Sequence, residues 1–98
     1  MKKQIFAFAA ALLVAPAAFA GTLKPNAVYC TEMKLLVKYL SHLEAGEQAF
    51  ADRMVFRGQC FTKQTAEKVV LRADMNPYVK LETVEGFTVW AQKADYQD

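Results

Sequence analysis

The stretch from Tyr78 to Tyr96, YVKLETVEGFTVWAQKADY, decides the fold of this chain. Apolar and polar residues alternate on both sides of the Glu85-Gly86 pair, and a turn signal between two alternating runs is typical of two antiparallel strands. Within the first run Val79, Leu81 and Thr83 are predicted to share one face, and within the second run Phe87, Val89 and Ala91 are predicted to share one face. The single tryptophan, Trp90, falls on the other face of the second run, beside Thr88 and Gln92.

A third strand is predicted upstream, at Lys68 to Leu71 (KVVL). It is separated from Tyr78 by residues 72–77, RADMNP, a turn rich in residues that interrupt regular structure. Short strands joined by tight turns favour a small antiparallel barrel within residues 60–98. Because an isolated hairpin is only marginally stable in water, we expect helices to cover part of this sheet.

Residues 30–58 have the pattern of a helical hairpin, or of one helix with a sharp bend at Gly46. Apolar residues recur at the i, i+3, i+4, i+7 spacing, which places them along one helix face, and Thr31 is the predicted N-cap. Residues 45–47, AGE, offer a break before a second apolar stripe that Gly58 can end. The two predicted stripes are Met33, Leu36 or Val37, Leu40 and Leu43, followed by Ala49, Phe50, Met54 and Val55.

Two cysteines, Cys30 and Cys60, bracket this hairpin. An even number of cysteines in an exported chain predicts a disulfide. A bond that closes a loop of this length would stabilise a small domain by about 3 to 4 kcal/mol. The alternative, a redox-active pair, lacks the C-x-x-C spacing that lowers a thiol pKa.

The N-terminus has the pattern of a secretory signal peptide over residues 1–20. Lys2 and Lys3 precede an apolar segment that Pro16 interrupts, and Ala18-Phe19-Ala20 forms an A-x-A cleavage pattern before Gly21. The apolar segment is too short to span a bilayer. We therefore expect residues 21–98 to form a single periplasmic or secreted domain with no transmembrane segment in the mature chain.

Charge disfavours a nucleic-acid partner. Lys2 and Lys3 account for the whole net charge of +2, so residues 21–98 carry a formal net charge of zero. Their basic residues are interspersed with acidic ones, as on an ordinary solvated surface, whereas a nucleic-acid interface concentrates basic residues on one face.

Part of the mature sequence resembles bacterial SH3-like domains. This resemblance lies in VVLRAD and in the run from YVKLET to KADY. The mature chain as a whole also resembles small exported proteins in which a cysteine-bracketed hairpin precedes an SH3-like barrel. That second resemblance rests on the order of Cys30, the helical pattern, Gly58-Gln59-Cys60 and the strands. The fold that this resemblance implies is α+β, with an N-terminal helical hairpin (residues 30–58) packed on a small antiparallel SH3-like β-barrel (residues 60–98). Such domains are mostly targeting or binding modules, and several of them, on cell-wall enzymes, contact peptidoglycan or its peptides.

The resemblance implies that Trp90 lies at the position of the strand tryptophan, with Tyr78 and Tyr96 able to flank it as ligand-binding residues. Aromatic clusters supply flat apolar area and a polar group for peptide or glycan contacts. The alternative is that Trp90 packs beneath the helical hairpin. Alternation fixes which residues share a face, but it does not fix which face is exposed to solvent.

The sequence offers little for catalysis. Ser41 and the single histidine, His42, are adjacent, and neighbours on a helix point about 100° apart, so they cannot form a nucleophile–base pair. One histidine and two cysteines give too few spaced ligands for a metal site. We expect no enzymatic activity, no cofactor and no metal.

Two classes of function remain. The first is a non-enzymatic binding or accessory module of the cell envelope that contacts a protein, a peptide or peptidoglycan. The second is a small secreted inhibitor or effector that inserts the loop Asp74 to Pro77 into an envelope enzyme or machine. The many aromatic residues have two explanations, which are incomplete burial in a small domain and homodimerisation.

Overall fold

The computed structural model describes residues 21–98, so the predicted signal peptide (residues 1–20) lies outside the described residues. In order along the chain, the elements are β1 (Gly21–Leu23), β2 (Val28–Cys30), α2 (Met33–Glu44), α3 (Gln48–Phe56), β3 (Cys60–Thr62), β4 (Glu67–Met75), β5 (Tyr78–Thr83), β6 (Thr88–Gln92), the short 3-10 turn η1 (Lys93–Asp95) and β7 (Tyr96–Gln97).

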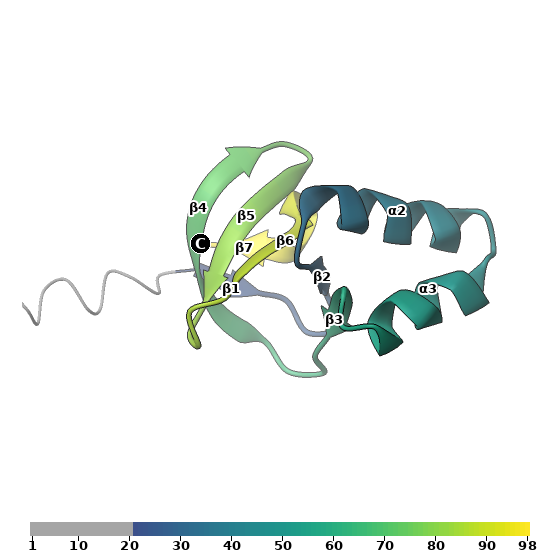
Figure 1. Ribbon diagram of the computed structural model, residues 1–98. Coiled ribbons are helices and arrows are strands. Elements are labelled where there is room, and N and C mark those ends of the chain that lie inside the picture. Colours follow the sequence, from purple (N-terminus) through teal and green to yellow (C-terminus); the bar gives the residue numbers. More distant parts are fainter. Residues whose placement is uncertain (1–20) are drawn as a thin grey trace, which may run out of the picture.

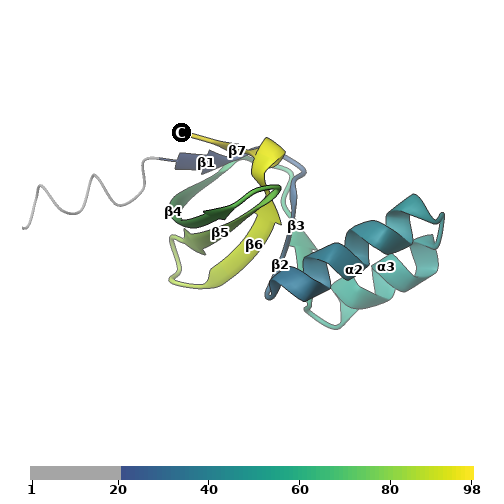
Figure 2. The same cartoon turned by 90° about the horizontal axis from the view of Figure 1, so that it is seen from above.

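The described strands form one antiparallel sheet with the spatial order β3-β2-β6-β5-β4-β1-β7. Figures 1 and 2 show this sheet curling on itself, while the two helices extend side by side from one end of it. Strands β3 and β7 are its two edges. The fold is therefore an open, strongly curved sheet with a helical hairpin attached.

This architecture corrects the predicted fold class in two respects. The helices lie in the middle of the domain and not at its N-terminus, because β1 and β2 precede them and belong to the sheet. The sheet is an open one and not a closed SH3-like barrel, because its edge strands β3 and β7 do not pair with each other. The prediction placed every strand after Cys60, whereas β1 and β2 precede the helices, β2 pairing with β3 and β6 and β1 with β4 and β7.

The two faces of the sheet belong to two different cores, and alternation along the strands sorts residues between them. Val79, Leu81, Val89 and Ala91 point to the inner face, where they pack with Leu23, Ala27, Tyr29 and Val69. The outer face carries Cys30, Cys60, Tyr78 and Trp90, which pack against the helices. The predicted grouping of Val79 with Leu81 and of Val89 with Ala91 is confirmed.

The helical hairpin itself forms between residues 33 and 56, as the sequence predicts, and turns at Gly46. Gly46 adopts a φ of 77°, a left-handed conformation that favours glycine. Its N–H donates to the carbonyl of Leu43 at 3.1 Å, and the N–H of Glu47 donates to the carbonyl of His42 at 2.8 Å. These two bonds make a Schellman C-terminus, and α3 ends at Gly58 in the same way.

Two details of the predicted hairpin are wrong. Helix α2 begins at Met33 with Glu32 at the N-cap, so Thr31 does not cap it. The buried positions are Leu36, Tyr39, Ala51 and Met54. Several residues of the predicted stripes, namely Val37, Leu43, Phe50 and Val55, are instead exposed, because the helices bury a narrower face than the pattern suggests.

The predicted disulfide is present and joins Cys30 to Cys60. The two cysteines are direct register partners of β2 and β3, with their Cα atoms 3.9 Å apart, and both are fully buried in the hairpin core. The bond therefore joins the strand that enters the hairpin to the strand that leaves it.

Strand β5 has the predicted bounds, but β4 extends further than expected. It continues through residues 72–75, which the sequence assigns to a turn, and its pairing with β5 shifts register between Leu71 and Ala73. Within residues 21–98, no helix is long and apolar enough to cross a membrane.

Candidate functional site: an apolar groove over a buried carboxylate

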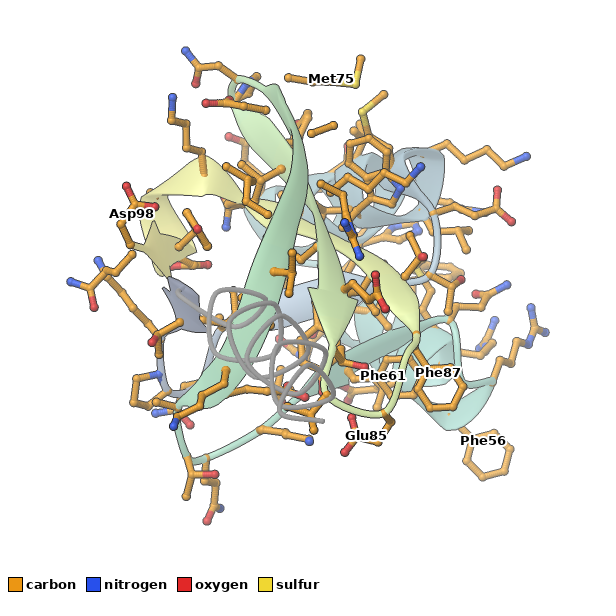
Figure 3. The ribbon with its side chains drawn as sticks, turned by 90° about the vertical axis from the view of Figure 1, so that its left-hand side faces the viewer. Phe56, Phe61, Met75, Glu85, Phe87 and Asp98 are labelled. Atoms are coloured by element: carbon orange, nitrogen blue, oxygen red, sulfur yellow. A yellow bond between two sulfur atoms is a disulfide. The ribbon has the colours of Figure 1, made fainter. Side chains whose placement is uncertain are left out.

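An open groove of about 530 Å³ lies where β2, β3 and the turn between β5 and β6 come together. Figure 3 shows Phe61, Glu85 and Phe87 on this side of the molecule, and Phe56 projects from the same side. The residues that give the groove its character are Tyr29, Phe61, Lys63, Glu67, Phe87 and Val89. We call it the Glu67 groove.

Aromatic side chains form its walls. Tyr29 and Phe61 are register partners across β2 and β3, and their ring centroids lie 5.7 Å apart with the rings tilted by 33°. Tyr29 is buried and Phe61 is half-buried, so part of this aromatic surface is available from the groove. Phe87 is 67% exposed at its rim.

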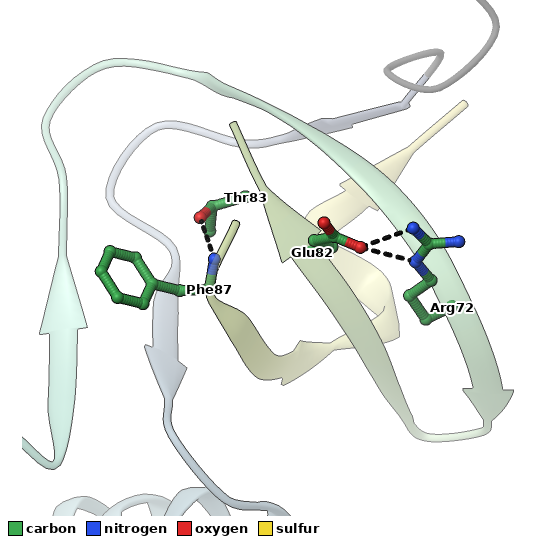
Figure 4. Close-up of polar contacts among 4 residues, drawn as sticks. All are labelled: Arg72, Glu82, Thr83 and Phe87. Atoms are coloured by element: carbon green, nitrogen blue, oxygen red, sulfur yellow. Dashed lines mark hydrogen bonds and ion pairs between the residues drawn. The ribbon is translucent and has the colours of Figure 1, made fainter. Parts of the chain in front are cut away.

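The turn between β5 and β6 holds Phe87 in place. Thr83 is buried, and its Oγ1 accepts a hydrogen bond from the N–H of Phe87 at 3.1 Å (Figure 4). The backbone pair is completed by the Thr83 N–H, which donates to the carbonyl of Phe87 at 2.9 Å. Gly86 takes a φ of 94°, which lets the chain reverse within this turn. The side chain of Phe87 is thus exposed, while its backbone is held by hydrogen bonds to Thr83.

Glu67 supplies the charge at the base of the groove. Its side chain is only 9% exposed, and its Oε2 accepts a hydrogen bond from the Lys63 ammonium at 3.2 Å. Its Oε1 is buried and has no hydrogen-bond partner among the described residues. Buried polar atoms almost always have a partner, because leaving one without costs the desolvation energy of that atom. Oε1 is therefore an acceptor with no donor in hydrogen-bond geometry, and the nearby donor is the Tyr29 hydroxyl, whose pKa is raised in part by a hydrogen bond to the Glu67 carboxylate.

The electrostatics of nearby groups reflect this carboxylate. The pKa of the Tyr29 phenol is raised, first by burial, then by the negative charge of Glu67, and also by a hydrogen bond to that carboxylate. The pKa of Lys63 is also raised, by its hydrogen bond to Glu67 and by the charge of that carboxylate. Glu85 is the other charged residue that lines the groove, so its lining carries one positive and two negative side chains.

A ligand with an apolar group could pack against Phe61 and Phe87, while an N–H or O–H group donates to Oε1 of Glu67. Among residues 21–98, three or more histidine, cysteine or carboxylate side chains do not gather into a metal-binding cluster.

The three residues that the sequence pointed to as ligand-binding lie elsewhere and do not come together as one set. Tyr78 and Trp90 are on the outer face, half-buried against the hairpin core. Tyr96 packs against the inner core, and its ring lies so close to Gly21 that a Cβ at that position would overlap it. Burial and a hydrogen bond to Asp98 raise the pKa of Tyr96.

Sequence reasoning missed the Glu67 groove, although one signal for it existed. Glu67 is two residues before Val69 in β4, so both side chains point to the same face of the strand, and Val69 is fully buried. A carboxylate in phase with an apolar inward-facing residue predicts a buried charge. The partners Tyr29 and Phe61 could not be found in this way, because their strands are three residues long.

No protein-family model, no curated protein and no solved structure matches this chain. The resemblance to exported proteins with SH3-like domains therefore stays a prediction as far as function is concerned.

Proposed function

We propose that this protein is a non-enzymatic binding or accessory module of the bacterial cell envelope, and that it holds a peptide or protein segment in the Glu67 groove. The observation that carries the proposal is the buried Oε1 of Glu67, which has no donor in hydrogen-bond geometry at the base of an apolar groove. A ligand that donates there would replace a missing hydrogen bond and would gain more than the same contact made at an exposed carboxylate.

The walls of the groove suggest which groups the ligand carries. Aromatic surfaces bury apolar side chains well and tolerate different shapes, and Phe61 and Phe87 provide such a surface. The donor that best complements a carboxylate is an amine or a guanidinium. We infer a segment in which an aromatic or aliphatic side chain lies next to lysine or arginine.

The extracytoplasmic location is supported by the Cys30–Cys60 disulfide, since such bonds persist in oxidising compartments, and by the signal-like pattern of residues 1–20. Peptidoglycan peptides and other exported proteins are the partners that such a location offers.

Titration of the ¹⁵N-labelled, oxidised protein with two short peptides tests the proposal. Acetyl-Phe-Lys-amide should give saturable shifts at the amides of Tyr29 and Phe87, and acetyl-Phe-Glu-amide should bind at least fivefold more weakly. Glu67→Gln should reduce the preference for lysine, and Phe87→Ala should weaken both peptides. Phe56→Ala is the control, because Phe56 is 91% exposed and lies outside the groove. Equal binding of both peptides, or binding that Glu67→Gln leaves unchanged, would contradict the proposal.

One observation favours the second candidate function, that of a small secreted inhibitor or effector. The tip between β4 and β5 presents Met75, which is 54% exposed, and the tip is braced by an ion pair of 2.8 Å between Lys93 Nζ and Asp74 Oδ2. Rigid loops that display an apolar side chain bind with a low ordering cost. If Met75→Ala abolishes binding to an envelope protein while Phe87→Ala does not, this reading replaces the first.

A further inference from the structure

The helical hairpin contains a second groove, whose chemistry is opposite to that of the Glu67 groove. It measures about 290 Å³ and lies between α2 and α3, the two helices that run side by side in Figure 2. Each helix contributes two basic residues spaced i, i+4, and the groove is lined by Lys38 and His42 from α2, by Arg53 and Arg57 from the end of α3, and by Phe50. No carboxylate side chain of residues 21–98 lines it.

Three of the four basic residues of this groove have no acidic partner among residues 21–98. Within the described chain, Lys38, Arg53 and Arg57 make no ion pair, whereas His42 pairs with Glu47 at 2.8 Å. Glu32 pairs with Lys34 at 3.6 Å, and the acid next to Arg53, Asp52, accepts a hydrogen bond from Gln48 at 2.8 Å instead. Arg53 and Arg57 are like charges four residues apart at the end of α3, a spacing at which like charges repel one another.

An aromatic ring orders two of the basic groups. The guanidinium of Arg53 lies 5.3 Å from the ring centroid of Phe50, and the ring of His42 stacks on the same phenylalanine at 5.2 Å. The Nδ1 of His42 is 2.8 Å from Oε1 of Glu47. Both side chains are therefore held in position before any ligand arrives.

The helix dipole explains only part of this arrangement. Basic side chains are favoured at the C-terminal end of a helix, which accounts for Arg53 and Arg57 at the end of α3. Lys38 is in the middle of α2, where the dipole gives no such preference. The helix dipole therefore does not explain why Lys38 of α2 lines the same groove as Arg53 and Arg57.

We propose that this groove binds a phosphate-type oxyanion. Guanidinium groups match the geometry of phosphate oxygens and donate two hydrogen bonds in parallel, and Lys38 adds a third charge from the opposite helix. Phe50 and Met54 supply apolar surface beside the anion. The same chemistry is offered by a small phosphorylated compound and by the headgroup of an anionic phospholipid.

Two probes distinguish these sources. Inorganic pyrophosphate is titrated into the oxidised ¹⁵N-labelled protein, with the amides of Phe50, Met54 and Gln59 as reporters. In parallel, flotation with vesicles of phosphatidylglycerol in phosphatidylcholine measures binding to headgroups. The test variant is Arg53→Gln/Arg57→Gln, and the matched control is Lys24→Gln/Lys68→Gln, which removes the same charge at two exposed positions outside the groove. Thermal unfolding confirms that both variants fold.

We expect saturable binding that weakens at least tenfold in the arginine variant and less than twofold in the control. Saturation by pyrophosphate indicates a small phosphorylated ligand, and binding to vesicles alone, lost in the arginine variant, indicates a lipid headgroup. Binding to neither probe, or an equal loss in both variants, overturns the proposal. The outcome is independent of the Glu67 groove, because none of the substituted residues lines it.

Discussion

Lys63 and Glu67 form an ion pair that satisfies only half of the carboxylate: Lys63 donates to Oε2 at 3.2 Å, while Oε1 has no partner within residues 21–98. The side chain of Lys63 is 46% exposed and remains hydrated, whereas that of Glu67 is 9% exposed. The desolvation free energy that this ion pair costs therefore comes from burial of the Glu67 carboxylate and not of the Lys63 ammonium. Binding sites often contain residues that lower the stability of the free protein, and Glu67 lines a groove.

Replacing Glu67 should accordingly stabilise the protein. In Glu67→Met the desolvation cost disappears and Lys63 stays solvated, so we expect the free energy of unfolding to rise by about 1 kcal/mol. Urea denaturation measures the change. Glu85→Met, on the exposed turn, should alter stability by less than about 0.5 kcal/mol. A loss of stability in Glu67→Met would mean that the carboxylate is satisfied in solution.

Removal of the disulfide should be costly. Cys30 and Cys60 are 30 residues apart, and opening a loop of that size in the double variant Cys30→Ala/Cys60→Ala should lower the free energy of unfolding by about 3 to 4 kcal/mol. Chemical denaturation followed by the fluorescence of Trp90 measures it. A loss below about 1 kcal/mol would show that the unfolded chain is already restrained in this region.

The environment of Trp90 offers a test of how the hairpin packs. Trp90 is half-buried against the core that contains Leu40 at its margin, so acrylamide should quench its fluorescence several-fold less in the native protein than in urea. Leu40→Ala should increase native quenching, because it removes a neighbour from that core. Leu43→Ala, on the same helix but 38% exposed, should leave quenching unchanged. Equal quenching in both variants would place the hairpin away from Trp90.

Asp74 should contribute to the acid limb of stability. The pKa of Asp74 is lowered below 3.8, first by its hydrogen bond from Lys93 and then by that from the Asn76 N–H. A depressed carboxyl pKa gives stability that is present above the unfolded pKa and is lost as the pH falls through the folded pKa. Asp74→Asn should therefore lower the urea midpoint at pH 7 and have little effect at pH 2. The same loss at both pH values would assign the effect to the turn and not to the charge.

Much of the architecture could be predicted from local patterns. Strand β5 was found with its bounds because Val79 and Leu81 alternate with polar residues, and the helical hairpin was found because its apolar residues recur with helical spacing. Strands β1, β2 and β3 were missed because three residues are too few to show a period. Their pairing partners are also distant in the sequence, as Gly21 pairs with Val69, and the open sheet follows from those pairings.

The candidate site was harder to predict for a related reason. Trp90, the only tryptophan, was predicted to bind a ligand or to pack beneath the hairpin, and the strand pattern could not distinguish the two. Tertiary packing places it on the face that the hairpin covers. The Glu67 groove combines residues from β2, β3 and the β5–β6 turn. A sequence pattern could show that Glu67 faces inward, but it could not show which aromatic rings would meet it there.

The helical hairpin leaves the sheet at Cys30 and returns at Cys60, and these two residues are register partners across β2 and β3 and are covalently joined. Residues 31–59 therefore form an insertion into the sheet, and the disulfide holds the two ends of this insertion next to each other. Changes in the length or sequence of α2 and α3 can therefore accumulate without moving the strands that form the Glu67 groove. One part of the molecule is free to diversify in evolution while the other keeps its shape, and the disulfide is the boundary between them.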